Sequence, residues 1–275
     1  LCRRYVLMGD ISLVKKCIFC YEDCSGSKRA KEHIFPQHIQ RRFSIHKAKL
    51  LNAHSKVVSG DFAGGHISIL PPERQMTFSG FLAGSICSKC NNGWMSDLET
   101  KVIPFIYDLI EGYRNVSHCN NDERNLLALW AFKTSAVLSE STTAPQNRLL
   151  PRHAEQFYKS GCTEIPKRVA VFAYSSETEG FLWSLSPTWQ LTTHSSLPQD
   201  LMTFMSKNAY KIFIQLGRLM LVTCYWPSET VTYTKEQWAG FELTNNGVDT
   251  ITSYDTRDFF EQEAEAFLMS ISAEI

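Results

Sequence analysis

The chain has 275 residues, and its hydrophobic content of 44% excludes a disordered protein and supplies a core for one large domain or two modest ones. Its formal net charge is zero, but residues 1–100 hold 14 Lys and Arg against 8 Asp and Glu, whereas residues 101–275 hold 14 against 20. The basic front part is therefore the one suited to a polyanion. No apolar run approaches the ~20 residues of a membrane span, and the first residues lack a signal-peptide core. We therefore expect a soluble cytoplasmic protein without a membrane partner.

Two Cys-x-x-Cys pairs indicate a metal site: Cys17 with Cys20, and Cys87 with Cys90. Each turn aims two sulfurs at one point, and two turns complete the tetrahedral shell that zinc accepts. Residues 21–86 separate the pairs, so the metal would join distant segments and add its binding free energy to folding. Disulfides or unrelated buried thiols are the alternatives, but nine cysteines without a secretory signal fit a reducing compartment. Cys24 has ligand spacing from Cys20 and could displace Cys17, although we rank it as a spare thiol.

Basic residues concentrate between Lys15 and Lys56, where ten Lys and Arg face three acidic residues. This density favours phosphate binding. Within it, residues 35–42 predict a short helix that buries Phe35 and Ile39 and turns Arg41 and Arg42 outward. The Gly- and Pro-containing stretch at residues 52–72 predicts a loop with short strands, as an insertion near residues 44–80 between the cysteine pairs.

Helices are predicted after the second cysteine pair. Asn91 suits a helix N-cap, and Trp94, Leu98 and Val102 share a face. Pro104 should end or kink this helix, with a second helix over residues 105–113. The clearest helix spans residues 121–140, with Asn121 as its cap and a buried stripe that includes Trp130.

The remaining chain predicts mixed α+β structure. Residues 168–174 and 181–185 read as strands, and residues 210–216 and 218–226 flank Gly217 as a hairpin. A closing helix is expected from a cap at Asp255 or Thr256 to Ile271.

The ordered set of Cys17-x2-Cys20, Glu32-His33-x2-Pro36 and Cys87-x2-Cys90-Asn91 resembles the HNH endonucleases. The match is closer to a branch with Glu-His and with Cys-Asn-Asn-Gly-Trp-Met followed by Leu-Glu, and it covers residues 17–99. The resemblance implies a ββα metal finger with a four-cysteine zinc site over residues 1–113. An accessory domain of helices and antiparallel strands would follow over residues 114–275 and could serve as a homodimer or protein-partner surface.

The resemblance also implies roles for the polar residues. His33 would be the general base, Glu32 an oxygen ligand to a catalytic Mg²⁺ or Mn²⁺, and Asn91 the final ligand of that ion. The zinc would be structural. The expected substrate is double-stranded DNA, cleaved by phosphodiester hydrolysis in genome defence or in a mobile element. The residues expected to bind its phosphates are Lys28, Arg29, Lys31, Arg41 and Arg42.

Two departures from the family pattern are visible. Leu82 stands where members carry a middle Asn, and the gap between the cysteine pairs is longer than in the usual finger. Asn52 or His54 could replace that Asn, and His38 or Asn92 could join the metal ligands. The rival function is a non-catalytic zinc module that binds nucleic acid or protein, which would need the four thiolates but not Glu32, His33 or Asn91.

Overall fold

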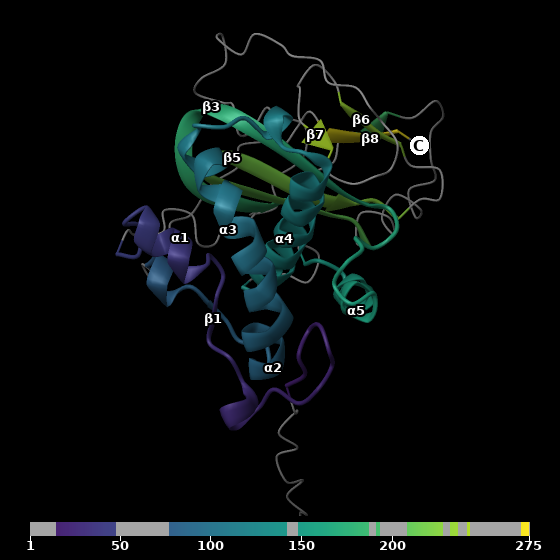
Figure 1. Ribbon diagram of the computed structural model, residues 1–275. Helices are drawn as coiled ribbons and strands as arrows, with labels where there is room; N and C mark the ends of the chain where they lie inside the picture. Colours follow the sequence, from purple (N-terminus) through teal and green to yellow (C-terminus); the bar gives the residue numbers. More distant parts are fainter. Residues whose placement is uncertain are drawn as a thin grey trace, which may run out of the picture.

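The computed structural model describes residues 15–47, 77–141, 148–186 and 208–227, together with the strand segments 191–192, 232–235, 241–242 and 271–274. Figure 1 shows the N-terminal elements beside a helical layer and two long strands behind it. The helices are α1 (Gln37–Arg42), α2 (Ser88–Cys90), α3 (Ser96–Glu111), α4 (Asn121–Ser139) and α5 (Pro151–Lys159), with short 3-10 turns at Gly26–Lys28, Phe78–Gly80 and Val116–His118 and a π-helical turn at Asn91–Met95. The strands are β1 (Glu32–His33), β2 (Leu82–Ala83), β3 (Val169–Ser186), β4 (Leu191–Thr192), β5 (Tyr210–Tyr225), β6 (Thr232–Lys235), β7 (Phe241–Glu242) and β8 (Ile271–Glu274).

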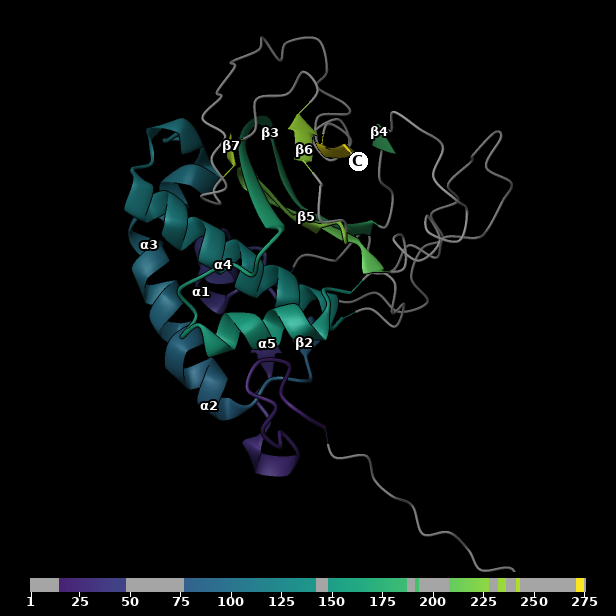
Figure 2. The same cartoon turned by 90° about the vertical axis from the view of Figure 1, so that its right-hand side faces the viewer.

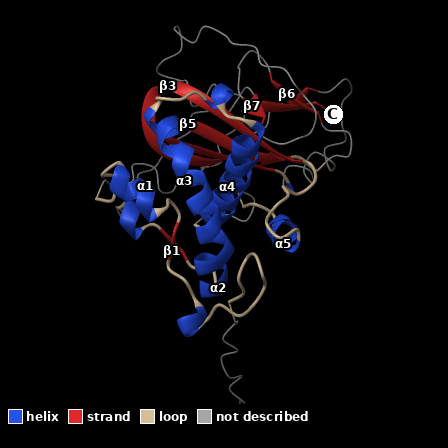
Figure 3. Ribbon diagram, viewed as in Figure 1, coloured by secondary structure: helices blue, strands red, loops and turns tan. Residues whose placement is uncertain are grey.

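These strands form three small sheets. β1 pairs with β2, β3 lies between β5 and β7, and β8 lies between β4 and β6. All pairings are antiparallel except that of β4 with β8. Helices and strands separate clearly in Figure 3. The mixture confirms the α+β prediction.

Strand β5 and the first part of β3, residues 169–174, are buried on both faces. Helices α3 and α4 pack against each other and against β5 on one face, as Figure 2 shows. On the other face Ala170, Phe172, Met220 and Val222 belong to a separate apolar cluster. Burial on both faces explains why β5 and the first part of β3 are nearly continuous hydrophobic runs, whereas the polar residues 175–180 of β3 include exposed positions.

The hairpin predicted around Gly217 is wrong. Residues 210–225 form one strand, and both of its halves pair with β3. Gly217 has φ +55 and packs against the backbone carbonyl of Ile110, so it makes a bulge and no turn. The bulge shifts the alternation of the strand: Ile212 and Ile214 face the main core before it, and Leu219 and Leu221 after it. The two predicted strands of residues 168–174 and 181–185 likewise join into the single strand β3, and the shift in its register with β5 lies between Ser175 and Gly180, opposite Gly217 and Leu219.

Helix α3 continues through Pro104, so the predicted break is wrong. A proline inside a helix removes one hydrogen bond and costs ~3 kcal/mol or more. Val102 and Phe105, on either side of the proline, are both buried, as are the later Ile106 and Leu109. This continuous apolar stripe against α4 and β5 outweighs the local cost. The helix ends at Gly112, whose φ of +76 suits a left-handed cap.

Helix α4 agrees with its prediction to within one residue. Its N-cap is Asn120 and not Asn121, because Asn120 and Glu123 form a reciprocal capping box. Trp130 is fully buried, as expected for a core residue. The helix after Glu32-His33 is confirmed as α1, which begins at Gln37 and buries Ile39.

One apolar core joins the N-terminal elements to the long strands. Trp183 of β3 stacks on Phe81 with ring centroids 4.9 Å apart, and it also contacts Phe35. The same core includes Ile106 of α3 and Trp130 of α4. Elements on both sides of the predicted domain boundary near residue 113 contribute to this core.

Other predictions fall outside the described residues: the loop at 52–72, the substitutes Asn52 and His54, and nearly all of the closing helix. Ile271, its expected last residue, opens strand β8. Among the described helices, none combines the length and apolar character needed to cross a membrane.

Candidate functional site

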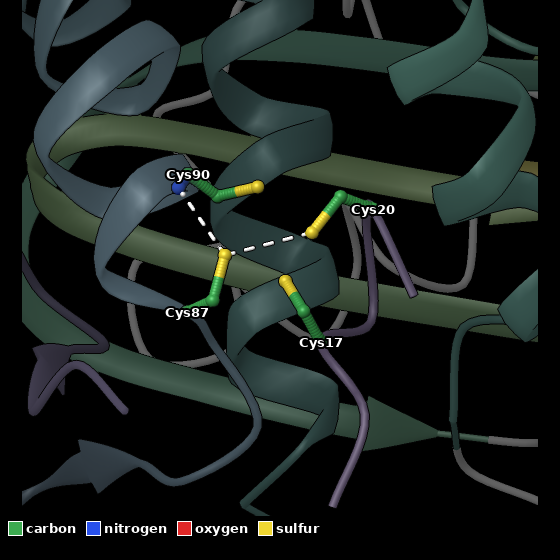
Figure 4. A group of neighbouring side chains, drawn as sticks. All are labelled: Cys17, Cys20, Cys87 and Cys90. Atoms are coloured by element: carbon green, nitrogen blue, oxygen red, sulfur yellow. Dashed lines mark hydrogen bonds between the residues drawn. The ribbon is translucent and has the colours of Figure 1, made fainter. Parts of the chain in front are cut away.

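The four predicted zinc ligands converge. The sulfurs of Cys17, Cys20, Cys87 and Cys90 lie within 4.8 Å of one another, and Figure 4 shows all four pointing toward a common centre. The Sγ atoms of Cys20 and Cys87 are 3.5 Å apart. A tetrahedral ion with bonds of about 2.3 Å requires sulfur–sulfur separations of about 3.8 Å. The cluster could therefore hold a metal such as zinc.

Local backbone geometry explains why each pair converges. The Cys17 N–H donates to the Glu22 carbonyl at 2.9 Å and the Tyr21 N–H donates to the Cys17 carbonyl at 3.0 Å, which closes a tight turn around the first pair. The second pair opens helix α2, where Cys87 is the N-cap and its sulfur accepts from the Cys90 N–H at 3.4 Å. Cys24 lies outside the cluster, and its thiol donates to the Lys15 carbonyl at 3.3 Å.

The thiols depend on one another electrostatically. A hydrogen bond from Cys90 lowers the pKa of Cys17 to about 4, and the same interaction raises the pKa of Cys90. Burial raises the pKa of Cys20 to about 11. The thiolate form of Cys17 is therefore favoured over those of Cys20 and Cys90, whereas a metal ion would bind all four cysteines as thiolates.

A polar pocket of about 240 Å³ lies beside this cluster and brings the predicted catalytic residues together. Glu32 and His33 from β1 and Asn91 from the turn after α2 all line it. His38 and Glu99 also line it. Consecutive strand residues normally point to opposite faces, but β1 has only two residues and its neighbours leave the strand, so both side chains reach one pocket.

Glu32 is buried next to a second carboxylate and a lysine. Its side chain is 13% exposed, and its Oε1 lies 4.0 Å from Nζ of Lys133. Lys133 has no exposed side-chain surface and donates to Oε1 of Glu99 at 2.6 Å. Burial raises the pKa of Glu32 to about 7; Lys133 opposes this shift and Glu99 adds to it. The carboxyl group of Glu32 therefore gains and loses its proton near neutral pH.

His33 has an orienting network. The amide nitrogen of Gln37 lies 3.0 Å from Nδ1 of His33, and Arg41 donates to Oε1 of Gln37 at 2.9 Å. Burial and the charge of Arg41 lower the pKa of His33, while a hydrogen bond with the Ser79 backbone opposes them. The ring is therefore neutral near pH 7, as a general base requires. Leu82 pairs with His33 across the small sheet, so the ring is oriented by Gln37 and Ser79 and not by an amide at position 82.

Asn91 is not the helix N-cap that the sequence predicted. It has helical dihedral angles, because the helix already begins at Ser88 with Cys87 as its cap. The following π-helical turn contains a non-helical Gly93, and the Asn91 amide nitrogen donates to Oδ1 of Asn92 at 3.1 Å. The Asn91 side chain is therefore free of a capping role and borders the pocket.

Sequence reasoning missed Lys133 and gave Glu99 no role of its own. Glu99 ends the Leu-Glu of the motif, so a signal existed, whereas Lys133 lies within a helix whose pattern predicts only core. His38 was a further candidate ligand in the sequence. Its Nδ1 forms a hydrogen bond of 2.9 Å with the Tyr107 hydroxyl. Its Nε2 is buried without a hydrogen-bond partner, 3.9 Å from Glu99.

Of the predicted phosphate-binding residues, Lys31 lines the pocket and the other four do not. Lys31 lines the pocket and also an adjacent hollow with Arg29, while Lys28 is exposed and 3.9 Å from Asp23. On α1, Arg41 binds Gln37, and Arg42 forms an ion pair with Glu111 at 2.9 Å.

No protein-family model, curated protein or solved structure matches the chain. Membership of the HNH endonucleases therefore stays a prediction from the motif.

Proposed function

We propose that this chain is a metal-dependent endonuclease of the HNH type that hydrolyses phosphodiester bonds of DNA. The observation that carries the proposal is the shared pocket of Glu32, His33 and Asn91 beside the four-cysteine cluster. Either feature alone has a simple structural explanation. Together they supply a base, two oxygen ligands for a hard cation and a scaffold that fixes their positions.

In this mechanism the neutral His33 ring takes a proton from the attacking water through Nδ1, which Gln37 otherwise occupies. Glu32 and Asn91 offer oxygens to Mg²⁺ or Mn²⁺, which would polarise the phosphate and stabilise the leaving oxygen. The exposed cations around the pocket, including Lys31 and Arg41, would hold the neighbouring phosphates. The zinc cluster would have only a structural role.

His33→Ala tests the proposal. Cleavage of a supercoiled plasmid in Mg²⁺ or Mn²⁺ should fall by roughly two to four orders of magnitude, because proton transfer is lost. Zinc content and DNA affinity should not change. His118→Ala is the matched control, since His118 is exposed on the turn before α4. An unaltered cleavage rate in His33→Ala across several metals would remove the nuclease assignment.

The second candidate is a non-catalytic zinc module that binds nucleic acid or protein. One observation favours it: Lys133 already partners the buried carboxylate of Glu99, so Glu99 is satisfied without a divalent ion. The same plasmid assay separates the two functions, because a module without activity should leave the plasmid uncut both with and without His33, whereas the nuclease should cut it only with His33. A role in genome defence or in a mobile element, in a reducing compartment such as the cytoplasm, belongs to the proposal and not to the alternative.

A further inference from the structure

Lys133 is a fully buried cation that the proposed chemistry does not use. It lies in α4, which belongs to the C-terminal part of the chain, yet its ammonium group reaches the carboxylates of α3 and β1. A buried ammonium group is costly unless partners satisfy its charge and its hydrogen bonds. Its position beside the pocket therefore indicates a role connected with the two carboxylates.

The contacts of Lys133 with the two carboxylates are unequal. Nζ donates to Glu99 at 2.6 Å, whereas the 4.0 Å separation from Glu32 is too long for a hydrogen bond. Glu99 is therefore held by the lysine, and Glu32 feels its charge but keeps its oxygens available. With Lys133 charged and both carboxylates ionised, these three groups carry a net charge of −1. The nearby Lys31 is exposed at the rim, where solvent screens it.

We propose that Lys133 is a positioning residue that stands in place of a second cation between Glu99 and Glu32, so that the pocket binds a single divalent ion through Glu32. This inference rests on the proposed function, because it concerns the same catalytic ion. It also gives the C-terminal part a defined role, because α4 completes the charge balance of a site whose other residues lie before residue 100.

The physical consequence is that metal affinity should follow the pocket charge. Once both carboxylates are ionised, Lys133→Met carries a charge of −2 on these groups, whereas Glu99→Gln keeps one carboxylate and the lysine, a charge of zero. In Glu99→Gln the lysine is released to pair with Glu32 and competes with the ion. In the double variant Lys133→Met/Glu99→Gln the net charge of these groups returns to −1, because a neutral amide then lies beside a thioether side chain.

The experiment measures Mn²⁺ binding to the full-length, zinc-loaded chain, with free Mn²⁺ followed by its electron paramagnetic resonance signal. We expect Lys133→Met to bind about tenfold or more tightly than wild type and to take up a second ion. Glu99→Gln should bind about tenfold or more weakly, and the double variant should return to within about threefold of wild type. A purely structural lysine would weaken binding in every variant and would not give this order.

Circular dichroism and zinc content establish that each variant is folded. If Lys133→Met does not fold, Glu99→Gln and the double variant still decide the matter, because the double variant should bind Mn²⁺ about tenfold more tightly than Glu99→Gln. Weaker binding by a folded Lys133→Met, or no difference between these last two variants, overturns the role of Lys133. If the order holds but wild type does not cleave DNA, the nuclease function fails and the lysine role stands.

Discussion

Glu32→Gln should make the metal-free protein more stable at pH 8 although it should abolish Mg²⁺-dependent cleavage. Glu32 is only 13% exposed, and burial raises its pKa from 4.5 to about 7. The native state therefore binds the proton of this carboxyl group more tightly than the unfolded state does. The stabilisation from this group is complete below the unfolded pKa of 4.5 and is lost as the pH rises through about 7.

The size of this effect follows from the two pKa values. The difference between 4.5 and about 7 corresponds to about 3 kcal/mol of unfolding free energy once Glu32 is ionised in both states. Glutamine imitates the protonated carboxyl group at every pH. Its advantage over wild type should therefore grow from about 1.4 kcal/mol at pH 5.5 to about 3 kcal/mol at pH 8.

Urea unfolding followed by circular dichroism, in buffers free of Mg²⁺ and Mn²⁺ but with zinc bound, measures this difference. Glu123→Gln is the matched control of opposite sign, because Arg114 lowers the pKa of Glu123 and the variant should lose stability. The reasoning is refuted if Glu32→Gln is less stable than wild type at pH 8, or if its advantage does not grow with pH.

Three further predictions concern the metal, the DNA and the fold. Elemental analysis should find about one zinc ion per wild-type chain. Cys87→Ser should lose this ion and unfold the N-terminal elements, whereas Cys24→Ser should keep it. A wild-type protein that is folded, reduced and free of zinc would contradict this prediction. Arg41→Ala should weaken DNA binding, measured by fluorescence anisotropy. The slope of the logarithm of DNA affinity against the logarithm of salt concentration should fall in magnitude by about one. An unchanged slope would show that α1 does not face the phosphates. Gly217→Ala should destabilise the protein at least twice as much as Gly161→Ala in urea unfolding. Both glycines have positive φ, which costs about 1–2 kcal/mol, but only the first meets a neighbouring backbone, and equal losses would argue against the bulge.

The sequence by itself determined the features that depend on neighbours along the chain. The spacing of each cysteine pair predicts a turn whose sulfurs converge, and the two pairs do meet in one cluster. Helix α4 was predictable because its first turn carries polar capping residues and its interior a long apolar run. The pocket residues Glu32, His33 and Asn91 were indicated by the order of a motif, which is read from the sequence although its parts lie far apart along the chain.

Other features required the tertiary structure, because the same local pattern is compatible with two outcomes. A glycine between two apolar runs suits both a hairpin and a bulge, and the contact of Gly217 with Ile110, far away in sequence, decided for the bulge. A proline suits both the end of a helix and its interior, and burial of the apolar stripe on both sides of Pro104 decided for a continuous α3.

The clearest case is Lys133. In the sequence it is a charged residue within an apolar helix, a position that gives no sign of a partner. Packing of α4 against α3 buries its ammonium group, and burial then requires the carboxylate of Glu99 as a partner. Residues that far apart meet only after the chain has folded, so the charge balance of the pocket is a property of the tertiary structure alone.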